Sequence, residues 1–80
     1  MPMFYINFQK ADCIARALEG EEFDDLQQAV AAAMESGREL LANDIRSHST
    51  DPLLAVVITN NRDEEVAIIE AKELLPDRLR

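Results

Sequence analysis

The order of hydrophobic and polar residues along the chain predicts five structural elements, beginning with a hairpin. In residues 3–8, Phe4, Ile6 and Phe8 recur at every second position, which is the period of a strand with one buried face. Residues 13–18 follow a polar turn and predict a second, weaker strand, because alanine has a low preference for strands. The two stretches together predict an N-terminal hairpin.

The longest pattern is an apolar stripe at spacings of three and four residues, the repeat of an amphipathic helix. The stripe predicts a helix over residues 25–46, with Asp24 as its N-cap and Gln27 in the capping-box position. Gly37 lies on this stripe, where a glycine favours close packing of the helix onto a sheet. The members of the stripe are Leu26, Ala29, Val30, Ala33, Gly37, Leu40, Leu41 and Ile45.

Two further strands are predicted in the C-terminal half. Residues 53–59 are β-branched and almost wholly apolar, which is typical of a central strand. Residues 65–70 then return as a fourth strand, although the periodicity also allows a helix over residues 63–75. We favour the strand because it gives residues 53–59 a local partner. The tail, residues 76–80, is expected to fray.

The predicted order ββαββ indicates an α+β fold, with one long helix packed on one face of an antiparallel four-stranded sheet in a single domain. One helix covers only one face, yet residues 53–59 are apolar on both. One predicted face holds Leu54, Val56 and Ile58, and the other holds Leu53, Ala55 and Val57. We therefore expect the second face to be buried by another copy of the chain, as a homodimer or larger homo-oligomer.

Composition restricts the partners of the chain. Its 80 residues include 16 acidic and eight basic side chains, giving a formal net charge of −8. That charge opposes binding to nucleic acids and to anionic membranes. The sequence shows neither a signal peptide nor an apolar stretch long enough to cross a bilayer, so we expect a cytoplasmic protein. The expected partners are further copies of the chain and, in second place, a basic protein.

Few residues offer chemistry. Five acids surround Gly20 in residues 19–25, but their spacing differs from that of a calcium loop, so a solvated turn and helix cap explain them better. Cys13 and His48 could act as a nucleophile pair only if the fold brought them together. We expect instead a small buried cysteine and an exposed loop histidine. No cofactor or metal is expected.

Pro2 supports an alternative, enzymatic interpretation. Removal of Met1 would leave a proline amine at the start of a strand, and this opening resembles that of the tautomerase superfamily, in which the proline is the general base. The resemblance implies a cationic group near the amine, and Arg16 is the residue that could approach it from the second strand. It also implies a parallel β-α-β unit directly after Pro2, whereas residues 9–23 separate the first strand from the helix.

A second resemblance covers most of the chain. The start Met-Pro-x-Phe-Tyr-x-x-Phe and the later Glu-Gly-x-Glu-Phe-x-Asp-Leu, before an alanine-rich helix, resemble a small proteobacterial family of uncharacterised domains. The resemblance implies a fold but no activity. In physical terms the second motif is structural, because each of its residues has a role at the turn or at the helix start. Gly20 permits a tight turn, Phe23 closes the helix–sheet junction, Asp24 or Asp25 caps the helix, and Leu26 begins its buried stripe.

The leading interpretation is therefore a homo-oligomeric protein-interaction or regulatory module without catalysis. The enzyme that uses Pro2 is the alternative.

Overall fold

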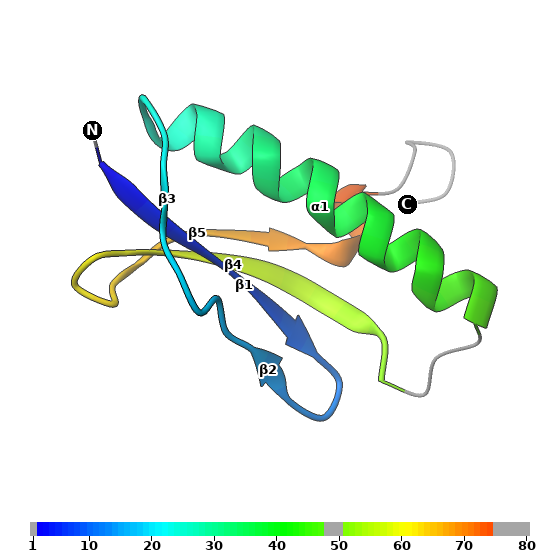
Figure 1. The fold of residues 1–80 in the computed structure, drawn as a ribbon. Coiled ribbons are helices and arrows are strands. Elements are labelled where there is room, and N and C mark those ends of the chain that lie inside the picture. Colours follow the sequence, from blue (N-terminus) through cyan, green and yellow to red (C-terminus); the bar gives the residue numbers. More distant parts are fainter. Residues whose placement is uncertain (1, 48–50, 75–80) are drawn as a thin grey trace.

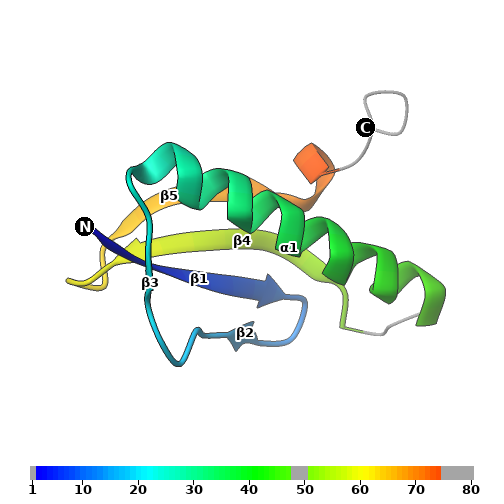
Figure 2. The same ribbon diagram turned by 45° about the horizontal axis from the view of Figure 1, so that its top comes forward.

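A computed structural model describes residues 2–47 and 51–74 of the protein. The sheet is antiparallel, with strand order β2-β1-β4-β5, and β3 also pairs with β1. A single long helix, α1, lies across one face of this sheet and leaves the other face open (Figures 1 and 2). The elements in chain order are β1 (Met3–Lys10), β2 (Ile14–Ala15), β3 (Glu21–Glu22), α1 (Leu26–Ser47), β4 (Leu53–Asn60), β5 (Glu65–Glu70) and the short 3-10 helix η1 (Ala71–Leu74).

The predicted α+β class, with one long helix and an antiparallel sheet, is confirmed. The predicted order ββαββ and the count of four strands are only roughly matched, because the described chain contains the extra strand β3 between β2 and α1. Residues 65–70 form β5 rather than part of a helix over 63–75. The predicted fraying of residues 76–80 lies outside the described residues.

The outer edge of β1 pairs with two short segments instead of one longer strand. The first segment, β2, lies opposite Phe8 and Gln9, and the second, β3, lies opposite Met3 and Phe4. The strand predicted at 13–18 is therefore only two residues long. The side chains of β3 are exposed glutamates, so its pairing is made by backbone alone and hydrophobic periodicity gives no sign of it.

The core lies between α1 and the central strands β1 and β4. Ala29 and Ala33 on the helix, and Val56 and Ile58 on β4, are wholly shielded from solvent. Small residues on α1 allow the helix to approach the sheet closely. A Cβ at position 37 would lie 2.8 Å from Leu74 Cδ1 and 3.0 Å from Val56 Cγ2, which explains why a glycine lies on the buried stripe.

Both ends of α1 differ slightly from the prediction. The N-cap is Asp25, whose Oδ1 accepts the Gln28 N–H at 2.9 Å, while Asp24 only accepts the Gln28 side-chain amide at 3.3 Å. In the last turn Ile45 is 63% exposed, and the buried position belongs to Asp44. Its Oδ2 accepts the Leu53 N–H at 2.9 Å, because here the inward side of the helix meets the start of β4 rather than apolar side chains.

Phe23 closes the junction between β3 and α1, as its place in the motif suggests. Its ring is half-buried against the core, with its centroid 6.2 Å from that of Phe4. Gly20 does not adopt a positive φ angle, so a left-handed backbone conformation is not the reason for a glycine here. A Cβ on Gly20 would lie only 2.9 Å from Tyr5 Cζ, so glycine is needed where the backbone crosses closely over β1 side chains.

Candidate site on the open sheet face

The open face is the side of the sheet that α1 leaves uncovered. Strand pairing fixes its membership, because directly opposite residues in an antiparallel sheet point to the same face. A register irregularity in β4 turns Leu54 toward this face and Leu53 into the core, so the predicted division of residues 53–59 between two faces is wrong at these two positions. The members of the open face are Tyr5, Asn7, Gln9, Ile14, Leu54, Ala55, Val57, Thr59, Glu65, Ile68 and Glu70.

One half of the open face is apolar. Ile14 is 41% exposed, Leu54 is 48% exposed and Ile68 is 57% exposed. Ala55 and Val57 lie between them and are already buried within the single chain, shielded by the flanking strands. Leu54 and Ile68 line a shallow depression of about 410 Å³ that also contacts Gln9, Glu70, Ala71 and Lys72. This half therefore combines exposed aliphatic side chains with a ring of polar residues.

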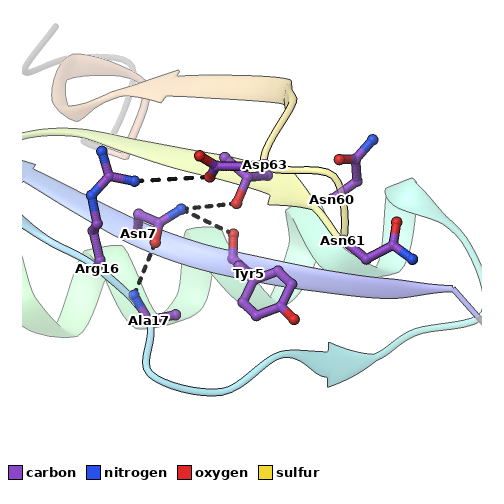
Figure 3. Close-up of a pocket in the computed structure, with 8 residues that line it drawn as sticks. Tyr5, Asn7, Arg16, Ala17, Asn60, Asn61 and Asp63 are labelled. Atoms are coloured by element: carbon purple, nitrogen blue, oxygen red, sulfur yellow. Dashed lines mark hydrogen bonds and ion pairs between the residues drawn. The ribbon is translucent and has the colours of Figure 1, made fainter.

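The other half of the open face is polar and contains a pocket of about 230 Å³ (Figure 3). Arg16 extends across this half toward Asp63 in the β4–β5 turn, with 3.9 Å between Nη1 and Oδ1. Both side chains are mostly exposed, so the pair contributes little to stability. The pocket is lined by Tyr5, Asn7, Arg16, Ala17, Thr59, Asn60, Asn61 and Asp63.

Asn7 is the buried polar residue at the centre of the open face. Its Nδ2 donates to the Val57 carbonyl and to Thr59 Oγ1, each at 3.2 Å, and its Oδ1 accepts the Ala17 N–H at 2.9 Å. Between β2 and β3 the chain does not pair with β1 through its backbone. The Asn7 side chain holds this segment by accepting the Ala17 N–H. With its donors and acceptor engaged in this way, Asn7 is a structural residue rather than a reactive one.

The β4–β5 turn holds Asp63 in a defined position. Asn60 Oδ1 accepts the N–H groups of Arg62 and Glu64 at 2.9 Å and 3.0 Å, which closes the turn. Asp63 has a φ of 61°, a left-handed conformation that aspartate tolerates better than most residues. The acidic side chain that faces Arg16 is therefore presented by a rigid turn.

The residues of the enzymatic alternative lie apart. Pro2 is exposed, and its carbonyl oxygen accepts the Phe23 N–H at 3.2 Å. On the outer side of this end of β1 the paired residues are Glu21 and Glu22, whereas Arg16 follows β2 and reaches toward Asp63. All pairings of β1 are antiparallel, so the parallel β-α-β unit expected of a tautomerase does not follow Pro2. The arrangement gives no support to a proline base.

Cys13 is exposed rather than buried, at the tip of the first hairpin. Its Sγ lies 3.6 Å from Asp51 Oδ2. Local desolvation and the negative charge of Asp51 raise the pKa of the Cys13 thiol, which lowers the thiolate fraction at neutral pH. The other member of the predicted pair, His48, lies outside the described residues.

Alkylation of Cys13 tests this environment. Because its pKa is raised, we expect the wild-type thiol to react with iodoacetamide more slowly at neutral pH than an ordinary cysteine, with the rate still rising above the usual thiol pKa. Asp51→Asn should move that rise to lower pH and speed the reaction. Asp12→Asn is the matched control, since the charge of Asp12 acts more weakly on the thiol. Identical pH profiles for wild type and Asp51→Asn would contradict the assignment.

The described residues contain no group of three or more histidine, cysteine or acidic side chains placed to hold a metal ion. Within that same part of the chain, no helix has the length and apolar character needed to cross a membrane. Among the acids of residues 19–25, Glu21 and Glu22 form β3 and Asp25 caps α1.

Comparison with known proteins identifies the family. Neither the search of curated proteins nor the comparison with solved structures gives a significant match. The model of a family described as a domain of unknown function, DUF6894, matches residues 3–78, which includes both sequence motifs. The resemblance to a family of uncharacterised domains is thereby confirmed, while a proteobacterial origin stays a prediction. The chain belongs to the DUF6894 family.

Proposed function

We propose that this protein is a homo-oligomeric protein-interaction module that works without catalysis and uses the open face as its contact surface. The observation that carries the proposal is the row of exposed Ile14, Leu54 and Ile68 on that face. Charged residues lie around the row, so the surface has the apolar centre and polar rim that are typical of protein interfaces. Exposed aliphatic side chains gathered on one face are a common mark of a binding surface.

A second copy of the chain is the first partner to test, because its identical open face has the size and shape needed to cover this one. Four strands spaced at about 4.8 Å, with about 3.3 Å per residue along β4, give a face of at most about 26 by 19 Å, because β2 and β5 are shorter than β4. Two stacked copies would then bury at most about 1,000 Å² in total. That area is near the lower limit for a specific interface. We therefore expect weak, concentration-dependent association. A basic partner on the same face is the second candidate, favoured by the net charge of −8.

Light scattering across a micromolar to millimolar concentration series tests the proposal. The wild type should rise from the 9.0 kDa mass of one chain toward twice that value. Leu54→Lys should keep the protein monomeric, because it places a charge at the centre of the apolar row. Ile45→Lys is the matched control: Ile45 is exposed on α1, away from the open face, so its replacement should leave association unchanged.

The proposal is wrong if the wild type stays monomeric throughout the series, or if Leu54→Lys and Ile45→Lys behave alike. Circular dichroism of both variants shows whether the fold is kept, since each replaced side chain is substantially exposed.

A further inference from the structure

We propose that two copies stack open face to open face about a two-fold axis that runs along β4, so that Arg16 of each copy meets Glu65 of the partner subunit. This inference rests on the proposed function and adds to it the orientation of the partner and the residues that select it. The argument uses the positions of the charges on the open face and the symmetry of a homodimer.

The charges on the open face are divided between its two edges. Arg16 directly follows β2 at one edge, and Glu65 begins β5 at the other. Both side chains line the same cavity, with Asn7, Val57 and Thr59 between them, so both point toward the open face. Glu70, the other acid on β5, already pairs with Lys72 at 3.1 Å. The acids Asp63 and Glu65 both lie on the β4–β5 side, and Arg16 starts from the β2 side and reaches toward Asp63. When Arg16 turns away from Asp63, the face is positive on the β2 side and negative on the β5 side.

Symmetry then limits how two copies stack. Sheets packed face to face in the aligned arrangement keep their strand directions within about 30° of one another. A two-fold axis lying between two such sheets must therefore run either along the strands or straight across them. An axis across the strands places each edge over the same edge of the partner, so Arg16 shares an edge with its own copy and Glu65 shares the other edge with its own copy. An axis along β4 exchanges the two edges, so unlike charges meet.

The apolar residues fit the same axis. Leu54 belongs to β4, so an axis along that strand brings it against its own copy, near the end of the strand where β4 begins. The exchange of edges also brings Ile14 on β2 toward Ile68 on β5 of the partner subunit, and both are substantially exposed in the single chain. This orientation thus covers the exposed row in the same step as it pairs the charges.

Arg16 is available for this contact. Its pair with Asp63 is long, at 3.9 Å, and its side chain is 64% exposed, so exchanging Asp63 for the carboxylate of Glu65 of the partner subunit loses little. Because each copy carries a net charge of −8, like-charge repulsion opposes association in every orientation. The two Arg16–Glu65 contacts therefore act mainly by favouring one orientation over the others.

A charge exchange tests the orientation. Arg16→Glu and Glu65→Arg, made separately, should each raise the dimer dissociation constant by about tenfold, because each puts two like-charge contacts into the interface. The double variant Arg16→Glu/Glu65→Arg has the wild-type net charge and should restore the wild-type dissociation constant. Analytical ultracentrifugation measures all four proteins. Arg46→Glu, an exposed replacement of the same type in the last turn of α1, is the control for net charge alone.

The outcomes separate this inference from the function on which it rests. A wild type that never associates overturns both. Association that Leu54→Lys abolishes, but that the double variant does not recover, overturns the orientation and leaves the interaction module standing. Equal effects of Arg16→Glu and Arg46→Glu would also overturn it, because net charge rather than a specific contact would then control the dimer.

Discussion

Replacing Asn7 with alanine is expected to destabilise the domain by about 2–4 kcal/mol, because the removed side chain serves several buried partners at once. Asn7 is 4% exposed. Its loss leaves the Ala17 N–H without its acceptor, and it removes a donor from Thr59 Oγ1 and from the Val57 carbonyl. The segment between β2 and β3 should then loosen, and with it the position of Arg16. Chemical denaturation measures the loss of stability, and amide hydrogen exchange at Ala17 reports the loosening.

Asn61→Ala is the matched control for Asn7→Ala, because Asn61 lines the same pocket but is exposed. A surface change of this kind is expected to alter stability by less than about 0.5 kcal/mol. If Asn7→Ala unfolded at the same denaturant concentration as Asn61→Ala, the central role given to Asn7 would be wrong.

Gly37→Val should have a comparable or larger effect, through overpacking. A Cβ at this position would already lie 3.0 Å from Val56 Cγ2, and Val56 is fully buried with a stiff side chain. Two further methyl groups have no space, so we expect a loss of about 3 kcal/mol out of a total of about 4–12 kcal/mol for a chain of 80 residues. The melting temperature measured by circular dichroism should fall by roughly 12–24 °C.

Gly37→Ala is the variant that separates space from helix propensity. Its single Cβ comes closest to Leu74 Cδ1, at 2.8 Å, and that methyl group is the end of a flexible side chain in η1. Leu74 should move aside, and the gain of about 1 kcal/mol in helix propensity should roughly offset the strain. A Gly37→Val protein as stable as Gly37→Ala would show that α1 does not approach the sheet as closely as the structure has it.

The proposed interaction surface could be predicted from the sequence only in part. The apolar run of residues 53–59 indicates a strand with two apolar faces, and hence a face that one helix leaves open. It does not say that Leu54 rather than Leu53 lies on that face, because an irregular register with β1 decides this. From the sequence, Arg16 is a possible cationic partner of Pro2, whereas in the fold it extends along the open face toward Asp63.

The sequence by itself determined the long helix, the central strand and the acidic cap, because each depends on neighbours within a few residues. The apolar stripe repeats every three or four positions, and Asp25 caps the helix by a bond to Gln28. What the tertiary structure decided depends on contacts between distant parts of the chain. Asn7 binds the Val57 carbonyl 50 residues later, and Asp44 turns inward because the start of β4 needs an acceptor for the Leu53 N–H. A local sequence pattern cannot predict such partners, because only the folded chain brings their polar groups within hydrogen-bonding distance.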